Sequence, residues 1–378
     1  MKDTMQTNHR IIIGDSRNMS EIKDQSIDLV VTSPPYPMIQ MWDKLFSSLA
    51  PRVNEYLGSH DGDSAFEAMH VELDKIWQEL YRVLKVGSFA CINIGDATRS
   101  IGGRFRLYPN HSRIISSFCA VGFDCLPVIL WRKPTNAPNK FMGSGMLPVG
   151  AYVTLEHEYI LIFRKGAKKE FQSGSEKRIR MRSSFYWEER NKWFSDIWDL
   201  KGAKQMLMHS DLRGRSAAYP LDLAWRLINM YSLYEDVVLD PFMGTGTTAC
   251  AAIACGRNSI GIEIDRAFAP HIINQAATFL SAANEIIASR IASHLSFAAS
   301  HSALKGPMRH RNGPHGYPVV TGQEKEIQHY KVKNISATSD LEVLAGYEPI
   351  GRMDNPENAE REKIKIVDTG SDQIRLAL

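Results

Sequence analysis

The sequence predicts an α/β protein built around a doubly wound, largely parallel sheet. One observation is a series of short apolar runs, rich in Ile and Val and bounded by turn residues, as buried parallel strands are. The other is that these runs alternate with segments whose apolar residues recur every three to four positions, as on the buried face of a helix. Such alternation is typical of a sheet with helices on both faces. A length of 378 residues allows one large domain or two.

Seven strands and four helices follow from these patterns. The predicted strands are residues 9–14, 27–33, 88–95, 126–131, 159–163, 237–240 and 259–264. The predicted helices are residues 65–84, 221–231, 247–255 and 267 to about 295. No internal repeat is visible.

Two regions interrupt the alternation. Residues 165–215 contain no clear strand and mix basic with aromatic side chains, which predicts an insertion with a task of its own. Residues 301–378 lose hydrophobic density and include the Gly- and Pro-rich RHRNGPHGYP, which predicts a peripheral, partly ordered extension. Residues 1–164 and 216–300 are then the two halves of one core.

Composition excludes several classes of protein. Hydrophobic residues make up 44% and charged residues 23% of the chain, which is ordinary globular usage. The net charge of +3 is too small to identify a nucleic-acid binder. Five cysteines without a C-x-x-C pair or zinc-like spacing predict neither a disulfide framework nor a metal site. The first ten residues lack the apolar region of a signal peptide, and no stretch approaches the ~18 apolar residues of a membrane span, so we expect a cytoplasmic protein.

A glycine-containing loop lies between a predicted strand and a predicted helix. Gly244-Thr245-Gly246-Thr247-Thr248 follows the strand at 237–240, and this geometry lets the backbone approach a ligand closely. No Lys follows the glycines, which disfavours a triphosphate-binding loop. Glu263 ends the next strand, where an acid can accept hydrogen bonds from both ribose hydroxyls. The spacing predicts a nucleoside site; the alternative is a structural turn beside a surface acid.

A second motif, Ser33-Pro34-Pro35-Tyr36, follows the strand at 27–33. Proline fixes φ and removes amide donors, so the segment is rigid and its carbonyl groups are free to accept hydrogen bonds. Ser33 and the Pro34 carbonyl could accept from the exocyclic amino group of a flipped base while Tyr36 stacks on its ring. The alternative is a proline-rich turn without a function.

Both motifs resemble those of the DNA amino-methyltransferases. Residues 240–248 together with 261–265 are similar to the S-adenosylmethionine site of that family, and residues 33–36 are similar to its catalytic motif. The catalytic motif precedes the cofactor motif, which resembles the permuted order called the β class. The resemblance spans roughly residues 9–280.

The resemblance implies a Rossmann-like, seven-stranded sheet with permuted motif order, S-adenosyl-L-methionine as cofactor and double-stranded DNA as substrate. The implied catalytic residues are Ser33, Pro34, Pro35 and Tyr36. The implied cofactor-binding residues are Asp15, Asp240, Pro241, Phe242, Gly244, Gly246, Thr247 and Glu263.

The first residue of the catalytic motif bears on the base. Ser at this position resembles the cytosine-N4 methyltransferases, whereas Asp is typical of the adenine-N6 enzymes. We therefore expect methylation of cytosine N4, with adenine N6 as the alternative. Methylation at cytosine C5 needs a thiolate, usually presented by Pro-Cys, and the chain contains no Pro-Cys. A catalytically silent DNA-binding subunit and an RNA methyltransferase remain alternatives. A restriction endonuclease acting on the same site is a candidate partner.

The insertion at 165–215 is the predicted target-recognition region. It carries thirteen Lys and Arg against seven Asp and Glu, a net charge of +6. Its basic run, followed by Phe185-Tyr186-Trp187, suits phosphate contacts and base reading. The predicted DNA-binding residues are Lys177, Arg178, Arg180 and Arg182. The alternatives are a solvated charged face here, with DNA recognised instead by residues 99–113 or by the C-terminal extension.

Overall fold

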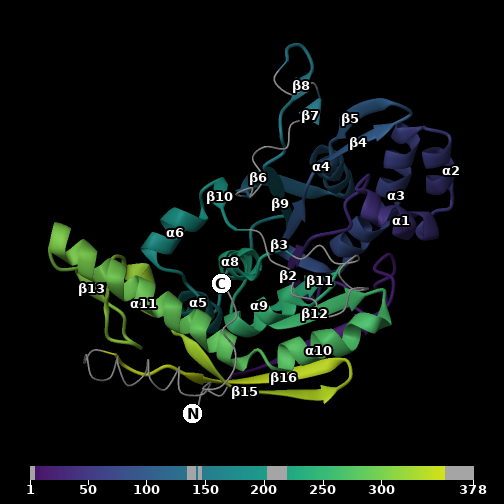
Figure 1. The fold of residues 1–378 in the computed structure, drawn as a ribbon. Coiled ribbons are helices and arrows are strands. Elements are labelled where there is room, and N and C mark those ends of the chain that lie inside the picture. The colour runs from purple at the N-terminus through teal and green to yellow at the C-terminus, as the bar shows by residue number, and fades with distance from the viewer. Residues whose placement is uncertain (1–4, 134–141, 144–146, 202–218, 354–378) are drawn as a thin grey trace.

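A computed structural model describes residues 5–133, 142–143, 147–201 and 219–353. Its centre is a ten-stranded sheet in the order β10-β6-β9-β3-β2-β11-β12-β1-β16-β15 (Figure 1). In chain order these strands are β1 (Met5–Ile13), β2 (Ile27–Thr32), β3 (Leu84–Ile94), β6 (Phe123–Arg132), β9 (His157–Lys165), β10 (Ile197–Asp199), β11 (Val237–Asp240), β12 (Asn258–Glu263), β15 (Tyr330–Ser339) and β16 (Glu342–Pro349).

All seven predicted strands are present, and the sheet is mostly parallel. β1, β2, β3, β11 and β12 run in one direction, and β6 and β10 share it, whereas β9 and β16 run against their neighbours. The parallel strands therefore end together at one edge, called here the carboxyl edge, and begin together at the opposite amino edge. The seven predicted strands form its unbroken middle, and β10, β15 and β16 extend it at its two ends.

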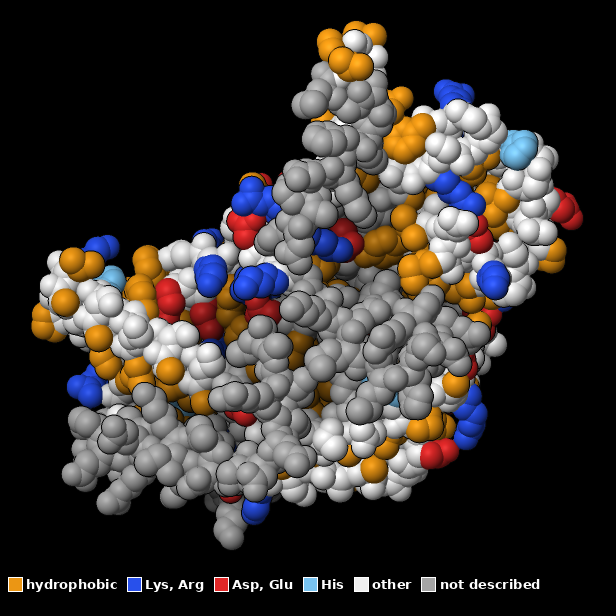
Figure 2. Space-filling view, in the orientation of Figure 1, with side chains coloured by type: hydrophobic (Ala, Val, Ile, Leu, Met, Phe, Trp, Pro, Cys, Tyr) orange, Lys and Arg blue, Asp and Glu red, His pale blue; other side chains and the backbone are white. Residues whose placement is uncertain are grey.

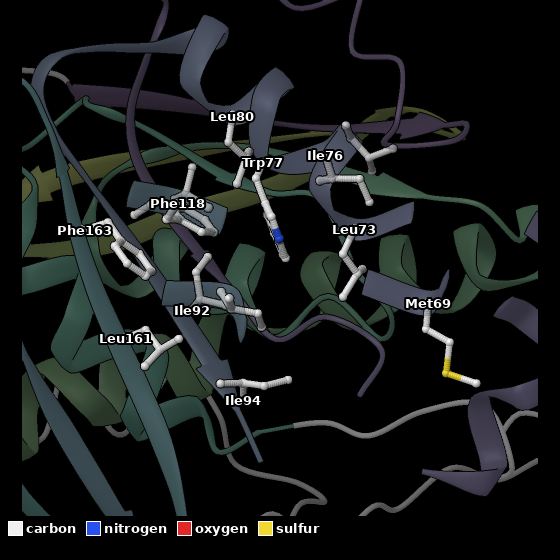
Figure 3. Packing of buried hydrophobic residues seen from close by; sticks show 14 of the residues in the cluster. Met69, Leu73, Ile76, Trp77, Leu80, Ile92, Ile94, Phe118, Leu161 and Phe163 are labelled. Atoms are coloured by element: carbon white, nitrogen blue, oxygen red, sulfur yellow. The ribbon is translucent and has the colours of Figure 1, made fainter. Parts of the chain in front are cut away.

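One face of the sheet is covered by α1 (Asp43–Leu49), α2 (Arg52–Gly58), α3 (Gly62–Val83) and α4 (Asn110–Val121). The Asp61 carboxylate caps α3 by accepting from the Ser64 amide at 3.0 Å. Trp77, spaced three or four residues from its apolar neighbours on the helix, is fully buried against β3, β9 and α4 (Figure 3). This packing fixes α3 against the sheet.

The other face is covered by α8 (Leu221–Tyr231) and α9 (Thr247–Cys255), and beyond them by α10 (Ala269–Ala277) and α11 (Leu280–Lys305). Alternate residues of β2 divide between the faces: Val30 packs under α3, and Leu29 and Val31 pack under α8. The helix predicted from residue 267 to about 295 is two helices, with a break at residues 278–279.

The C-terminal extension was expected to be peripheral, but residues 330–349 are part of the sheet. β16 pairs with β1, and the Tyr347 hydroxyl hydrogen-bonds to the Thr7 hydroxyl and to the Ile253 carbonyl, both at 2.9 Å. The sequence pattern did not reveal this, because pairing between β1 and β16 joins segments more than 300 residues apart. Residues 354–378 of the predicted extension lie outside the described residues.

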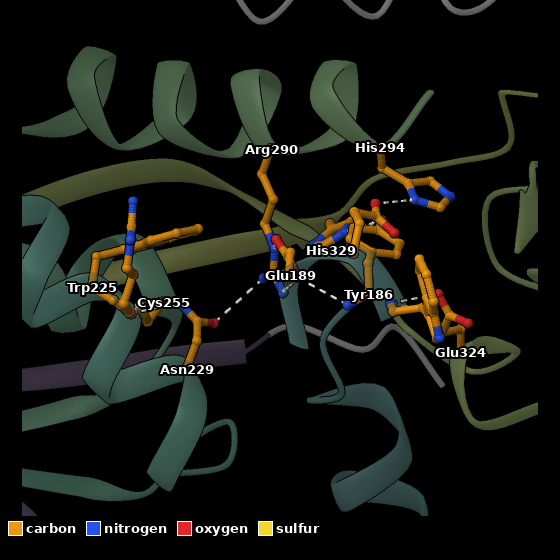
Figure 4. A network of polar contacts seen from close by, with 12 residues as sticks. Tyr186, Glu189, Trp225, Asn229, Cys255, Arg290, His294, Glu324 and His329 are labelled. Carbon is orange, nitrogen blue, oxygen red and sulfur yellow. Dashed lines mark hydrogen bonds and ion pairs between the residues drawn. The ribbon is translucent and has the colours of Figure 1, made fainter. Parts of the chain in front are cut away.

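The insertion forms α5 (Gly174–Arg182), α6 (Trp187–Trp193) and β10, so it contains one short strand that the sequence did not predict. A buried polar network attaches it to α11 (Figure 4). Arg290 pairs with Glu189 at 2.7 Å, and His294 pairs with Glu188 at 2.7 Å. The Tyr186 ring stacks on the His294 ring, with 3.8 Å between the two ring centres. Residues 202–215 of the insertion lie outside the described residues.

The remaining elements are short. They are the β4–β5 hairpin (Ala97–Ile101 and Arg104–Tyr108), β7 (Met142–Gly143) with β8 (Ala151–Tyr152), β13 (His310–Arg311) with β14 (Pro318–Val319), and the 3₁₀ helices η1 (Gln40–Trp42), η2 (Arg266–Phe268) and η3 (Gly322–Glu324). Within the described ranges no helix has the length and apolar character needed to cross a membrane. The same ranges hold no cluster of three metal-ligating side chains, and all five cysteines are free thiols.

Candidate active site

A cavity of about 680 Å³ opens at the carboxyl edge of the sheet. Its walls are the segments that follow β1, β2, β11 and β12, and α1 and α3 cover it. Ligands of open α/β sheets bind at this edge, where strand ends present loops and helix N-termini. The cavity volume lies within the range of small-molecule sites.

The glycine loop forms one wall of the cavity, and two glycines allow its path. Gly246 has a φ of 89° at the start of α9, and a Cβ there would lie 2.9 Å from a methyl group of Ile272. A Cβ on Gly261 of β12 would lie 2.0 Å from the sulfur of Met243. Only residues without a side chain therefore let the loop pack down on the neighbouring strand and helix.

Glu263 ends β12 and holds the glycine loop. Its carboxylate accepts hydrogen bonds from the Gly244 amide at 2.9 Å and from the Asp265 amide at 3.0 Å, one at each oxygen. An ionised carboxylate accepts about four hydrogen bonds, so both oxygens keep capacity for a ligand in the cavity that they line. Burial raises the pKa of Glu263.

Asp15 also lines the cavity, but its carboxylate is paired with a neighbour. The Arg17 side chain donates twice to one carboxylate oxygen of Asp15, at 2.6 and 2.9 Å, and also pairs with Glu72 of α3 at 2.5 Å. Burial opposes ionisation of Asp15, but these hydrogen bonds outweigh it, and the pKa of Asp15 is lowered. Arg17 and Glu72 line the same cavity, and the sequence patterns had not pointed to either of them.

Asp240 does not line the cavity; it lies behind the wall and joins its two halves. One carboxylate oxygen accepts from the Thr32 hydroxyl at 2.6 Å and from the Phe242 amide at 3.1 Å. The other accepts from the hydroxyls of Tyr219 and Thr248. Burial raises the pKa of Asp240. The end of β2, which leads into the Ser33 motif, is thereby tied to the glycine loop.

Ser33 and Pro35 line the cavity, and Tyr36 adjoins them without being one of its lining residues. The Tyr36 hydroxyl donates to Glu158 at 2.9 Å, receives a 2.8 Å hydrogen bond from the Asn93 side-chain amide, and contacts the Ser33 hydroxyl at 3.1 Å. Burial, together with the Glu158 charge, raises the pKa of Tyr36. Tyr36 is therefore an uncharged hydrogen-bond donor at neutral pH.

The space around Tyr36 depends on Gly95, which follows β3. A Cβ on Gly95 would lie 3.0 Å from the Tyr36 ring and 3.3 Å from Glu158. Glu158 also pairs with Lys133, whose ammonium group sits 4.4 Å from the Trp131 ring centre. Sequence reasoning missed this support, since it depends on the antiparallel pairing of β3 with β9.

The structure brings most of the predicted site residues to one cavity. Those that line it are Asp15, Ser33, Pro35, Pro241, Phe242, Gly244, Thr247 and Glu263. Pro34, Tyr36, Asp240 and Gly246 are not among its lining residues. Further lining residues that the sequence did not single out include Ser16, Trp42 and Phe268.

The predicted DNA-binding residues lie elsewhere, on α5 (Figure 1). β9 runs against β3, so the chain beyond Lys165 leaves the sheet at the amino edge. A Cβ on Gly87, near the start of β3, would lie 2.6 Å from the Lys169 backbone nitrogen. The six residues of β2 alone separate the two edges by about 20 Å. The four predicted DNA-binding residues are thus at the opposite edge of the sheet from Ser33; they are Lys177, Arg178, Arg180 and Arg182.

Comparisons with known proteins agree with this arrangement. A family model described as DNA methylase, of the N6 and N4 methyltransferases, matches residues 27–275. The chain is 48% identical to the Type II methyltransferase M.MthZI of Methanothermobacter thermautotrophicus over 96% of this chain and 100% of that protein. It is 52% identical to the Type II methyltransferase M.MjaI of Methanocaldococcus jannaschii over 70% of this chain and 90% of that protein.

A solved structure is also similar. It is TTHA0409 of Thermus thermophilus, a putative DNA modification methylase determined as a complex with S-adenosyl-L-methionine. The two structures match with a TM-score of 0.56 and 31% sequence identity, over 72% of this chain and 94% of that one.

Proposed function

Because the chain belongs to the N6 and N4 family of DNA methylases, we propose that it transfers a methyl group from S-adenosyl-L-methionine to the exocyclic N4 of a flipped cytosine in duplex DNA. The observation that carries the proposal is the single cavity at the carboxyl edge. It holds the glycine loop with Glu263 on one side and Ser33 with Pro35 on the other. A nucleoside cofactor and a target base can therefore meet there.

The cavity residues fit the cofactor. Glu263 keeps hydrogen-bonding capacity for the two ribose hydroxyls, while Phe242 and Phe268 offer apolar surface in the same cavity. The amino acid moiety of the cofactor carries one positive and one negative charge. The carboxylate of Asp15 would attract the positive charge, and the amide groups at the start of α9 would attract the negative one. When bound, this cofactor supplies an electrophilic methyl group.

The chain's own residues prepare the target amine. An exocyclic amino nitrogen is a poor nucleophile because its lone pair is delocalised into the ring. Hydrogen bonds from its protons to the Ser33 hydroxyl and the Pro34 carbonyl would favour a pyramidal nitrogen with a free lone pair. The Tyr36 ring, held at its hydroxyl by Glu158 and Asn93, would stack on the flipped base.

The choice of base rests on Ser33. A neutral hydroxyl lines the cavity where the adenine-N6 enzymes typically carry Asp, and this difference supports cytosine N4. Adenine N6 is the second candidate, because Ser33 and Pro34 present the same acceptors to either amino group. The intact cavity disfavours a catalytically silent subunit.

DNA would approach the carboxyl edge, because the base must reach the cavity there. The chain between β6 and β9 leaves the sheet at this edge. Its described residues 142–143 and 147–156, which include β7 and β8, are called here the arm. Figure 2 shows exposed hydrophobic side chains at the tip of the arm. Val149 and Val153 are 97% and 84% exposed. The Phe105 ring of the β4–β5 hairpin contacts Tyr152 of the arm at 4.8 Å. We propose that the arm and hairpin contact the substrate duplex.

We also propose that the enzyme serves a restriction-modification system in the cytoplasm, with an endonuclease of the same recognition site as partner. The similarity to two Type II methyltransferases supports this. Expression in cells without the endonuclease, followed by digestion of their DNA with candidate endonucleases, identifies the protected site.

The test of the reaction is mass spectrometry of nucleosides after incubation with cofactor and duplex DNA. N4-methylcytosine is the expected product, and Ser33→Ala should abolish it. N6-methyladenine would show that the target base is adenine, and 5-methylcytosine would contradict the mechanism. A parallel reaction with RNA of the same sequence should give no methylated product.

A further inference from the structure

A second large cavity, of about 840 Å³, lies at the amino edge of the sheet. Its floor includes Asp28 of β2 and residues 87–89 of β3, and its walls come from α5, α6, η3 and the segment before β11. It shares no lining residue with the cavity of the candidate active site. The two cavities are on opposite edges of one sheet.

The rim of this amino-edge cavity carries unneutralised positive charge. Lys168, Lys177, Arg180 and Arg190 are exposed, and none forms an ion pair with a residue in the described ranges. A fifth cation, Lys169, lies 3.7 Å from Asp28.

The acids of the same cavity are already engaged. Asp28 pairs with Lys85 at 2.7 Å. Glu324 is buried and accepts from the Trp187 amide at 3.0 Å and from Thr321. Asp236 accepts from the Leu233 amide at 2.7 Å. The five cations of the lining nevertheless outnumber these three acids, so the net charge of the cavity is positive, and it suits an anion.

Aromatic rings lie between the cations. Trp187 is 37% exposed and Phe194 is 43% exposed, although rings of this size are usually buried. The Arg180 guanidinium lies 4.5 Å from the Phe171 ring centre, and the Arg190 guanidinium lies 5.6 Å from that of Phe194. The cavity thus holds charges that attract phosphates next to aromatic rings, two of them partly exposed.

We propose that the amino-edge cavity binds a short unpaired stretch of DNA. Cations along a groove, interleaved with exposed aromatic rings, are the combination that binds single strands, because every unpaired base offers a face for stacking. A duplex keeps its base faces covered, and the cavity is of small-ligand size, so it admits a single strand. The proposal rests on the proposed function only in naming DNA as the polyanion.

The test measures fluorescence anisotropy of a labelled oligothymidylate with the full chain and two variants. Lys177→Glu with Arg180→Glu removes two cations from the cavity and should weaken binding at least tenfold. For single strands each phosphate contact contributes about 0.7 to the slope of log affinity against log salt, so the slope should fall by about 1.4. Arg178→Glu is the matched control, because Arg178 is exposed on the same helix but does not line the cavity.

Two further variants locate the bound strand. Trp187→Ala should weaken binding about tenfold through lost stacking. Tyr36→Ala, at the carboxyl edge, should leave oligothymidylate affinity unchanged. Loss of binding in Tyr36→Ala would place the strand in the active-site cavity and overturn the proposal, as would equal effects of Arg178→Glu and the double variant.

Two competitors complete the design. Tighter binding of a uridine oligoribonucleotide would overturn DNA as the occupant, and equal loss of duplex affinity in the double variant would overturn an unpaired one. Wild-type methyl transfer to duplex DNA is measured separately. Its absence, with oligothymidylate binding intact, contradicts the proposed function alone, whereas the reverse result contradicts only the second site.

Discussion

The hydroxyl of Tyr36 donates a 2.9 Å hydrogen bond to the carboxylate of Glu158, which lies 122 residues further along the chain. The same carboxylate accepts from Asn93 at 2.7 Å and pairs with Lys133. The hydroxyl oxygen lies on the axis about which the ring rotates, so these bonds fix the position of that axis, and the close approach of the ring edge to Gly95 restricts rotation about it. In the proposed reaction, the ring that would stack on the base is thereby held in place before the base enters the cavity.

Glu158→Gln removes the charge from this hydrogen bond and keeps the shape of the side chain. A hydrogen bond to a charged group contributes about 1.5–3 kcal/mol, so we expect kcat to fall tenfold or more. Cofactor affinity should not change, since Glu158 does not line the cavity. Steady-state methyl transfer and calorimetry separate the two effects.

Two controls apply to this prediction. Tyr36→Phe removes the same hydrogen bond from the other side and should reproduce the loss of kcat. Glu156→Gln makes the same chemical change at an exposed position two residues earlier and should have no effect. Full activity of Glu158→Gln would show that the ring is held by packing alone.

Glu263 predicts the pH dependence of cofactor binding. Burial raises its pKa above the ordinary value of 4.5. Only the ionised carboxylate can accept from both ribose hydroxyls while it holds the Gly244 and Asp265 amides. Cofactor affinity is therefore highest above the pKa of Glu263 and falls about tenfold per pH unit below it. The fall begins at a higher pH than for an exposed Glu.

Calorimetric titration of the cofactor across the acidic range tests this. Glu263→Ala should weaken binding by roughly one to two decades at neutral pH, because it removes about 1.5–3 kcal/mol of hydrogen bonding to a charged group. Glu263→Gln should bind weakly with no pH dependence in this range. The same pH profile in the wild type and in Glu263→Gln would assign the titration to another group.

The sequence predicted the parts of the site that are local. The strand, glycine turn and helix around Gly244 are consecutive in the chain, and so is the proline-rich motif after β2, so composition and spacing were sufficient. The same holds for Glu263, because β12 follows α9 directly.

The parts that the sequence could not predict depend on pairing between distant segments. Glu158 reaches Tyr36 only because β9 returns antiparallel beside β3. The same reversal carries α5 to the amino edge, so the basic segment predicted to bind DNA lies at the edge opposite to Ser33. Charge composition gives the sign of a surface but not the edge on which it is placed.

Gly246→Ala tests the path of the glycine loop. The new methyl group would lie 2.9 Å from Ile272, at a φ of 89° that side chains rarely adopt, so we expect a loss of at least about 1–2 kcal/mol in the free energy of unfolding. Gly244→Ala is the matched control, because a Cβ there meets only the Phe242 carbonyl oxygen, at 3.9 Å. Chemical denaturation should show the larger loss for Gly246→Ala, and equal losses would remove the Ile272 contact as its cause.

Asp240 provides the last prediction, because its role can be divided into hydrogen bonding and charge. Asp240→Ala leaves the Phe242 amide and the buried Thr32 hydroxyl without their acceptor, at a cost of about 1–3 kcal/mol for each unsatisfied buried group. Asp240→Asn keeps that acceptor oxygen, and its amide can donate to the hydroxyls of Tyr219 and Thr248, which can rotate to accept.

The pKa of Asp240 indicates which change should be milder. Burial raises it above 3.8, so the folded state favours the neutral form and the ionised carboxylate lowers stability at neutral pH. Asp240→Asn is neutral at every pH and avoids this cost, so its unfolding free energy should stay close to that of the wild type, while Asp240→Ala should lose several kcal/mol. Denaturation of both variants measures the difference. If Asn were as destabilising as Ala, the negative charge itself would hold the end of β2 against the glycine loop.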